Sequence, residues 1–303
     1  MTKFALIVGA TGGIGQALAR QFRGKGYLVV CFAPHKFALE LDEMKLTLGV
    51  IPYCMDITSI DDIRRARQFI KDTTGGRLDT LYVNLGVAYA HPAVEYDDAR
   101  MEQVFRVNLL GPIHVCKYLA KYVVATKGTI VFTTSIAACV PLAWTAVYGL
   151  LKAGLDTYAR YLHHELSPFG VSVYLVITGG VDTAIAAHAH EDSPSFDTEL
   201  YRVPEMALLV MAASQMTKNA TNPDDYAKVV VPVVSAPSPR FHVYAGQSGW
   251  LMGWLLRYLP EAWVLWVIAR KYKQDAVFVL AKAKAAAEAR AEARDQQKPV
   301  KHD

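Results

Sequence analysis

The residues best suited to acid-base chemistry are Tyr148 and Lys152, which stand four positions apart, with Ser135 thirteen residues before the tyrosine. On a helix, residues i and i+4 share a face, so the Lys152 ammonium can lie beside the Tyr148 phenol. A free tyrosine has a pKa of about 10, and a neighbouring cation lowers it toward the range that suits proton transfer near neutral pH. The same spacing also occurs on ordinary solvated helix faces. It indicates an acid-base pair here because Ser135 and a second motif upstream accompany it.

That second motif is a glycine-rich turn, Gly9-Ala10-Thr11-Gly12-Gly13-Ile14-Gly15, between the first apolar run and the first helical stretch. Glycines permit a tight turn, close approach of the backbone to a pyrophosphate, and close contact between strand and helix. The helix N-terminus that follows favours an anion. Glycine also marks ordinary turns, but this position at the start of an α/β repeat predicts a dinucleotide site.

Together the motifs resemble those of the short-chain dehydrogenase/reductases over roughly residues 3–245. The resemblance implies reversible hydride transfer between a nicotinamide cofactor and a carbonyl or alcohol carbon, with a catalytic set of Asn108, Ser135, Tyr148 and Lys152. In the reducing direction Tyr148 would be the general acid, and Ser135 would orient the carbonyl oxygen. Lys152 would lower the pKa of Tyr148 and bind the nicotinamide ribose, while Asn108 would hold a water linking Lys152 to solvent. Because all four positions are filled, we expect an active enzyme.

The resemblance also implies a set of cofactor contacts. They are Gly9, Thr11, Gly13, Ile14, Gly15, His35, Lys36, Asp56, Ile57, Asn84, Gly86, Tyr148, Lys152, Gly180, Val181 and Thr183. An acidic side chain after the second strand would bind the ribose hydroxyls of NAD and repel a 2′-phosphate. His35 and Lys36 stand there without a carboxylate, so the sequence predicts NADPH.

Four residues near the expected cofactor depart from the family pattern, namely Val8, Val83, Leu85 and Thr178. Each removes a hydrogen bond or adds bulk while keeping its strand apolar. We interpret them as drift, with a shifted cofactor position as the alternative.

Short apolar runs and helical stretches alternate from residue 3 to about residue 177. Runs without a polar face are typical of strands buried on both sides of a parallel sheet. The pattern predicts an α/β fold with a Rossmann-type doubly wound parallel sheet of about seven strands, followed by an apolar helical extension. The expected strands are Phe4–Val8, Leu28–Phe32, Ile51–Met55, Thr80–Asn84, Thr129–Thr134, Val171–Ile177 and Phe241–Tyr244. The expected helices are 13–24, 36–48, 59–72, 97–125, 145–167 and one starting near Asn222–Pro223.

Composition excludes several classes of protein. With 303 residues, 52% apolar and 20% charged, the chain is not disordered. Its four cysteines show no metal-ligand spacing, so we expect neither a disulfide framework nor a metal site, and a reducing compartment. Residues 269–303 hold nine Lys and Arg against five Asp and Glu, which accounts for the whole net charge of +4. The charge-balanced remainder does not suggest nucleic-acid binding.

The chain divides into an expected reductase domain, 1–246, and an extension, 247–303. Residues 249–269 form an apolar stretch that carries four of the five tryptophans. Arg257, Pro260 and Glu261 interrupt this stretch, which argues against a transmembrane helix. With the basic residues up to 273, this segment predicts an in-plane anchor on a membrane or lipid-droplet surface. The alternatives are helices that pack on the domain or line the pocket, or a dimer contact. Residues 281–294 are expected to form a solvated helix.

Within the family, this combination resembles the fungal NADPH-dependent acyl-dihydroxyacetone-phosphate reductases. We therefore expect a carbonyl reductase for a lipophilic ketone, with an acyl-dihydroxyacetone phosphate as one candidate, in the cytoplasm and peripheral on the endoplasmic reticulum or a lipid droplet. One alternative is a reductase that tailors a polyketide or terpenoid in fungal secondary metabolism. Another is a non-catalytic, cofactor-sensing module recruited to membranes. The family's usual pairing through the two long helices implies a homodimer or homotetramer.

The segment 184–203 follows the sixth expected strand, where such sheets place loops that cover ligands. Its His188, His190 and Arg202 could meet an anionic head group, although an ordinary solvated loop explains them as well.

Overall fold

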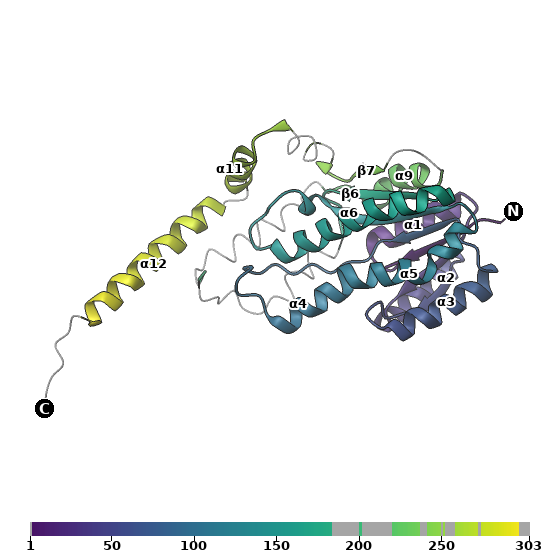
Figure 1. Ribbon diagram of the computed structural model, residues 1–303, viewed down its shortest axis with the longest axis horizontal. Helices are drawn as coiled ribbons and strands as arrows, with labels where there is room; N and C mark the ends of the chain where they lie inside the picture. Colours follow the sequence, from purple (N-terminus) through teal and green to yellow (C-terminus); the bar gives the residue numbers. More distant parts are fainter. Residues whose placement is uncertain are drawn as a thin grey trace, which may run out of the picture.

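A computed structural model of the chain describes residues 2–183, 200–201, 220–236, 241–249, 251, 258–271 and 274–296. Seven parallel strands form one sheet with the order β3-β2-β1-β4-β5-β6-β7. The sheet carries helices on both faces, and two further helices project from one end of the body (Figure 1). The predicted doubly wound, Rossmann-type fold is confirmed.

The strands match the predicted apolar runs to within one residue at each end. They are β1 Phe4–Val8, β2 Leu28–Ala33, β3 Ile51–Cys54, β4 Thr80–Val83, β5 Thr129–Ser135, β6 Ser172–Thr178 and β7 His242–Ala245. The central strands β1, β4, β5 and β6 are buried along nearly their whole length, which explains why their sequences show no polar face.

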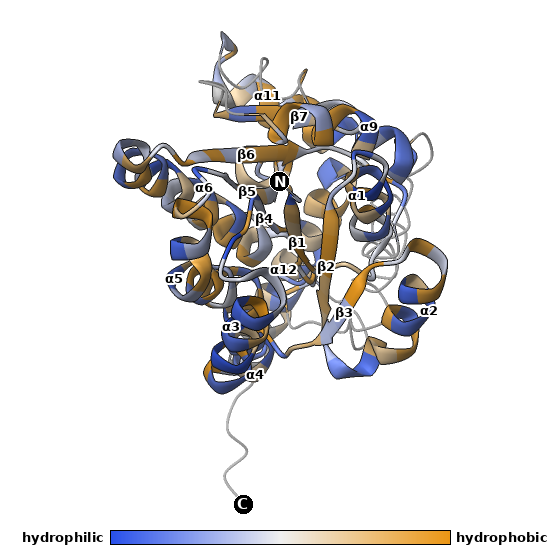
Figure 2. Cartoon of the chain, turned by 90° about the vertical axis from the view of Figure 1, so that its right-hand side faces the viewer, coloured by the Kyte–Doolittle hydropathy of each residue, from blue (hydrophilic) through white to orange (hydrophobic). Residues whose placement is uncertain are grey.

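Two hydrophobic cores lie on opposite faces of the sheet. One joins it to α1 Gly13–Gly24, α2 Ala38–Leu48 and α9 Pro223–Val234. The other joins it to α3 Ile60–Thr74, α5 Gly111–Val124 and α6 Ala146–Leu166. Figure 2 shows these two groups of helices on either side of the orange strands. As expected, α9 begins after Asn222, whose side chain accepts a hydrogen bond from the backbone N–H of Asp224.

The predicted single helix 97–125 contains a change of pitch. The α4 helix Asp98–Phe105 leads into a π-helical turn, Arg106–Leu110, which continues directly into α5. A π turn holds one more residue than an α turn and is frequent at functional sites. The turn contains Asn108, one of the four predicted catalytic residues.

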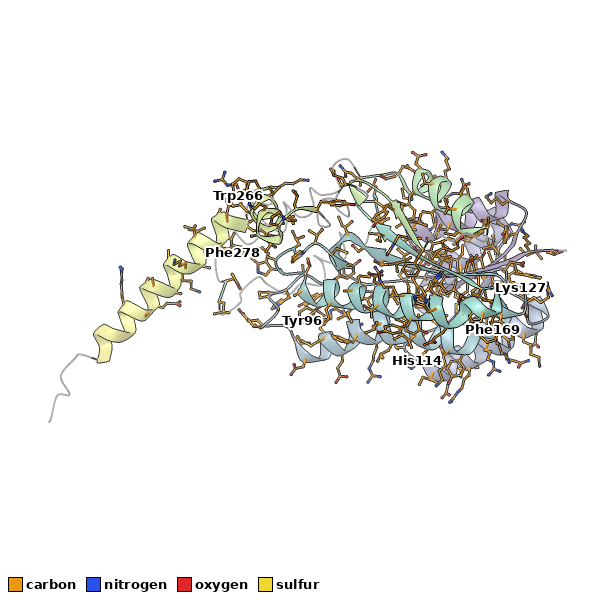
Figure 3. All side chains as sticks on the ribbon, turned by 45° about the horizontal axis from the view of Figure 1, so that its top comes forward. Tyr96, His114, Lys127, Phe169, Trp266 and Phe278 are labelled. Carbon is orange, nitrogen blue, oxygen red and sulfur yellow. The ribbon has the colours of Figure 1, made fainter. Side chains whose placement is uncertain are left out.

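The C-terminal part contains α11 Glu261–Lys271 and α12 Gln274–Gln296. Buried Val264 and Ile268 of α11 pack against Val140, in the loop that follows β5. Trp266 and Phe278 mark the two helices in Figure 3, at one end of the body. The described part of α12 is mostly exposed, as the sequence predicts for residues 281–294. Within the described ranges, no helix combines the length and the hydrophobicity needed to cross a bilayer.

Candidate active site

The glycine-rich turn connects β1 to α1, and two of its glycines are sterically required. Gly9 has φ +85°, and a Cβ at this position would lie 2.8 Å from Cα of Leu85. A Cβ at Gly15 would lie 2.3 Å from the carbonyl oxygen of Gly9, so only glycine lets α1 begin this close to β1. Close packing of the backbone therefore explains why glycine stands at positions 9 and 15 of this turn.

The start of α1 fits the pyrophosphate of a dinucleotide. Its N-cap residue, Gly12, provides no side-chain cap, and the first turn contains no acidic residue. A Cβ at Gly12 would meet no other atom within 4 Å, so the backbone N–H groups are open to an anion. The adjacent Thr183 closes one side of the turn, because its methyl carbon lies 3.2 Å from where a Cβ of Gly13 would stand.

Other predicted cofactor residues lie around this turn, at the carboxyl ends of β4 and β6. Asn84 donates a hydrogen bond from Nδ2 to the Gly9 carbonyl oxygen at 3.1 Å. Gly180 pairs with Gln247, and the buried Val181 is bridged to Thr221. Ile14 and Ile57 instead turn their side chains into the two cores, so only their backbones are available to a ligand.

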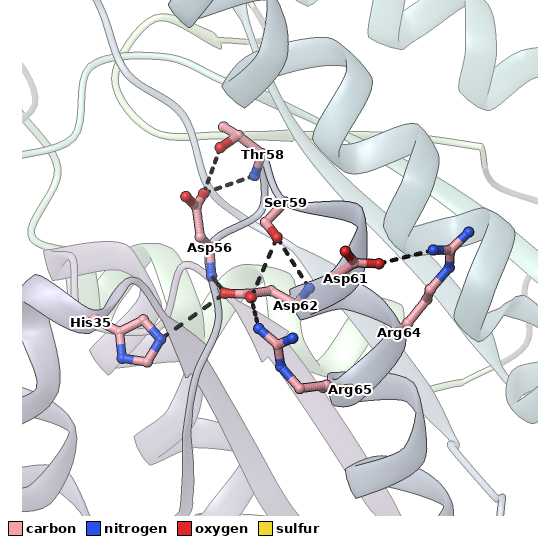
Figure 4. A network of polar contacts seen from close by, with 8 residues as sticks. All are labelled: His35, Asp56, Thr58, Ser59, Asp61, Asp62, Arg64 and Arg65. Atoms are coloured by element: carbon pink, nitrogen blue, oxygen red, sulfur yellow. Dashed lines mark hydrogen bonds and ion pairs between the residues drawn. The ribbon is translucent and has the colours of Figure 1, made fainter.

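His35 and Asp56 lie where β2 and β3 end, beside the start of α3 (Figure 4). His35 and Lys36 are exposed in the short helical turn that follows β2. Asp56 is engaged locally, because its Oδ1 accepts hydrogen bonds from both N and Oγ1 of Thr58, each at 2.8 Å. The carboxylate of Asp62 lies 4.0 Å from Nε2 of His35 and pairs with Arg65. Sequence reasoning missed Arg65, although its spacing from Asp62 is that of a helical ion pair.

The structure brings Ser135, Tyr148 and Lys152 together. Ser135 ends β5, and Tyr148 and Lys152 share the first turns of α6. A Cβ at Gly149 would lie 2.8 Å from the carbonyl oxygen of Ala137, so this glycine lets α6 approach the turn after Ser135. Nζ of Lys152 is 5.7 Å from the centre of the Tyr148 ring. The predicted shared face is therefore present.

Lys152 is buried, with only 3% of its surface exposed. Its Nζ donates a hydrogen bond to the backbone carbonyl oxygen of Thr133 at 3.2 Å. A Cβ at Gly86 would lie 3.1 Å from this Nζ, so the absence of a side chain there makes room for the ammonium. Burial disfavours the charged form and lowers the pKa of Lys152 to about 8.

The pKa of Tyr148 differs from the sequence prediction. Burial raises it to about 12, and the hydrogen bond with Ser135 is the interaction that opposes this rise. The expectation that the pKa of Tyr148 lies below its ordinary value of 10 is therefore wrong for this structure. The reason is that desolvation of the buried phenol disfavours its ionised form more than the interactions around it favour that form.

Asn108 is buried in the π turn and holds the loop that follows β4. Its Oδ1 accepts a hydrogen bond from the Val87 N–H at 2.8 Å, and its Nδ2 donates to the Val87 carbonyl oxygen at 2.7 Å. Both polar atoms of the amide are thus used within the protein. This pairing fixes the chain beside Gly86 and hence one wall of the space around Lys152.

Sequence reasoning also missed Thr133, which contacts both Lys152 and Asn84. The signal available was polar Thr133 and Thr134 at the end of an otherwise apolar strand. The segment 184–199, with His188 and His190, lies outside the described residues, as does Arg202. Within the described ranges, no group of three or more His, Cys, Asp or Glu residues could hold a metal ion.

A parallel α/β sheet with a glycine turn, an open helix N-terminus and a Ser-Tyr-Lys set defines a dinucleotide-dependent oxidoreductase. The family model for short chain dehydrogenases matches residues 3–194. The chain therefore belongs to the short-chain dehydrogenase family and is an NAD(P)-dependent oxidoreductase.

Similar proteins include two of fungal origin. The chain is 34% identical over 282 residues to the NADPH-dependent 1-acyldihydroxyacetone phosphate reductase of Saccharomyces cerevisiae, covering 91% of this chain and 93% of that protein. It is 33% identical over 278 residues to the short-chain dehydrogenase RED1 of Pyricularia oryzae, covering 90% and 95%. Among solved structures, a short-chain dehydrogenase from Streptomyces avermitilis shares the fold with a TM-score of 0.72 at 20% identity, covering 91% and 97%.

Proposed function

We propose that the protein is an NADPH-dependent carbonyl reductase that acts on a lipophilic ketone, with an acyl-dihydroxyacetone phosphate as the first candidate. The observation that carries the proposal is that Ser135, Tyr148 and buried Lys152 meet at one place. Hydrogen bonds through Thr133 and Asn84 connect Lys152 to the glycine turn that precedes α1. A module that only senses a cofactor would not need this complete acid-base set.

A nicotinamide dinucleotide bound along the glycine turn would supply the hydride for the carbonyl carbon. On the protein side, Ser135 would donate a hydrogen bond to the carbonyl oxygen and orient it. Tyr148, protonated at every pH below its pKa of about 12, would give its phenolic proton to the oxygen as negative charge develops there. Protonated Lys152 would stabilise the phenolate that remains, and its free N–H groups would hold the cofactor's ribose.

The choice of NADPH over NADH is supported by the charges at the ends of β2 and β3. His35, Lys36 and Arg65 bring positive or titratable groups to the region where a 2′-phosphate would lie. Asp62 already pairs with Arg65, so it is partly neutralised as a source of repulsion. The similarity to a reductase named as NADPH-dependent supports the same choice.

The substrate class rests on similarity of nearly equal strength to two kinds of relative. The name of one specifies an acyl-dihydroxyacetone phosphate, and the name of the other specifies no substrate. A reductase that tailors a polyketide or terpenoid is therefore the second candidate. NADPH consumption measured with 1-acyl-dihydroxyacetone phosphate and with a panel of polyketide and terpenoid ketones separates the two.

Tyr148→Phe tests the assigned chemistry. The substitution removes only the acidic hydroxyl, so we expect kcat to fall by about 10³-fold, near the contribution of a general acid. Folding and NADPH binding should be kept. Tyr161→Phe, which changes an exposed tyrosine of the same helix, should retain full activity. Turnover by Tyr148→Phe equal to that of the wild type would refute the mechanism.

We also propose that the C-terminal extension binds a lipid surface, which would place the protein at the cytoplasmic face of the endoplasmic reticulum or a lipid droplet. Support comes from α11, where Trp263 is 66% and Trp266 55% exposed. The guanidinium of Arg270 lies 4.7 Å from the centre of the Trp266 ring and could meet anionic headgroups. Within the predicted anchor 249–273, residues 250, 252–257 and 272–273 are outside the described part of the chain.

A homodimer or homotetramer formed through the long helices is part of the same proposal. Leu150 and Tyr161 of α6 are 59% and 67% exposed. They stand eleven residues apart, about three helical turns, and so share one outward face. The molar mass of the purified protein by light scattering tests this assembly.

A further inference from the structure

Thr133 is the residue of β5 that connects Lys152 to the glycine turn. Its backbone carbonyl oxygen accepts the hydrogen bond from Nζ of Lys152 at 3.2 Å. Its hydroxyl donates to Oδ1 of Asn84 at 2.9 Å, and Nδ2 of Asn84 donates to the Gly9 carbonyl oxygen at 3.1 Å. Three hydrogen bonds thus run from α6 through β5 and the end of β4 to the turn after β1.

The register of the sheet explains why Thr133 is available for this role. The pairing of β4 with β5 ends at Val83 and Phe132, one residue before Thr133. On the other side, Thr133 remains paired with Val176 of β6, which holds its backbone in the sheet. The Thr133 peptide therefore has a fixed position but no partner residue in β4. Lys152 and the side chain of Asn84 bond to Thr133 where that partner would otherwise be.

The hydroxyl of Thr133 also determines the orientation of the Asn84 amide. An amide presents an acceptor on one side and donors on the other. Because the hydroxyl donates to Oδ1, Nδ2 must face the Gly9 carbonyl oxygen. With a side chain that cannot donate, Oδ1 would lose this partner and the amide could rotate away from the turn.

We infer that Thr133 is a positioning residue, which fixes the Lys152 ammonium relative to the glycine turn and so aligns the two ends of the cofactor site. The inference rests on the proposed function, because it assigns Lys152 to the cofactor ribose. Its consequence is that the Thr133 hydroxyl affects NADPH binding and turnover together without touching either ligand.

The test compares Thr133→Val, which replaces the hydroxyl with a methyl group of similar volume, with Thr133→Ser, which keeps the hydroxyl. Thr80→Val is the matched control, because buried Thr80 accepts a hydrogen bond from Thr129 at the opposite end of the same two strands. NADPH affinity is measured by fluorescence titration and kcat by NADPH consumption.

We expect Thr133→Val to weaken NADPH binding and lower kcat by about tenfold each, as displacement of a site residue does. Thr133→Ser should restore both to within about twofold of the wild type, and Thr80→Val should change neither. The inference would be overturned if the NADPH affinity and kcat of Thr133→Val were within twofold of those of Thr80→Val. It would also be overturned if Thr133→Ser did not restore the two quantities.

If Thr133→Val does not fold, Thr133→Ala and Thr133→Ser provide the same comparison, since they differ only in the hydroxyl. The titration also separates this inference from the proposed function. A wild type that reduces no ketone refutes the function, whereas NADPH binding still shows whether Thr133 positions the site.

Discussion

Lys152 is the residue at which the requirements of the site and of the fold conflict. The site needs an ammonium close to Tyr148, but that position is buried in the protein. The ammonium donates a hydrogen bond to the Thr133 carbonyl oxygen, and burial lowers the pKa of the lysine to about 8. The charged lysine therefore destabilises the folded protein.

The sign of this effect predicts a pH dependence of stability. The pKa falls from an ordinary value of 10.5 to about 8 on folding, so the unfolded chain binds more protons between these pH values. Stability then rises with pH across the window from 8 to 10.5. Lys152→Met should be more stable than the wild type at pH 7, by about 2 to 3 kcal/mol, and the difference should shrink above pH 8.

Urea unfolding at pH 7 and pH 10 measures this difference. Lys45→Met, which removes an exposed lysine on α2, is the control and should show no comparable gain at either pH. A Lys152→Met protein less stable than the wild type at pH 7 would contradict the prediction.

At the scale of the elements, α11 packs on the loop that follows Ser135, the proposed catalytic serine. Val264 and Ile268 pack on Val140, with Ile136 and Leu142 beside them. The next helix contacts the same loop, because the ring of Phe278 in α12 lies 5.9 Å from that of Trp144. The buried members of this cluster belong to neither core of the sheet, and Ile136 connects it to the core that contains α3, α5 and α6. We therefore expect that it can loosen without unfolding the domain.

We therefore expect Ile268→Ala to lower kcat by at least about threefold while the unfolding midpoint changes little. Hydrogen exchange of residues 136–145 should accelerate in this variant. Val267→Ala, which shortens an exposed neighbour, is the control. Unchanged exchange of the loop in Ile268→Ala would show that α11 does not support it.

The elements also show how far the sequence could predict the site. Apolar runs specify the strands, and the spacing of Ser135, Tyr148 and Lys152 specifies where three side chains meet. The π turn around Asn108 has no sequence signal, because its extra residue is visible only in the backbone. Thr133 was missed because its role depends on β4 ending one residue before it, and strand ends are not fixed by hydrophobicity alone.

On the scale of the whole molecule, α11 is marked by two exposed tryptophans, Trp263 and Trp266, whereas Trp144 of the body is half-buried. Tryptophan favours the boundary between lipid and water, where its ring is partly buried and its N–H still finds a partner. We expect Trp263→Ala/Trp266→Ala to reduce binding to phosphatidylserine-containing vesicles by about tenfold or more in a flotation assay.

Leu39→Ala/Leu46→Ala is the matched control, since it removes two exposed apolar side chains from α2. It should float like the wild type. Equal flotation of the tryptophan variant and the wild type would remove α11 from the lipid contact. Activity on a water-soluble ketone should be the same in all three proteins.

The π turn has one more consequence, which concerns the phase of the helix that contains it. Its additional residue turns everything that follows by about 100° relative to an uninterrupted α-helix. Deleting one residue from 106–110 would restore regular pitch and keep the helical content, but it would rotate α5 out of register with α4. The number of residues in the π turn therefore determines the direction in which Asn108 faces, independently of the identity of the surrounding residues.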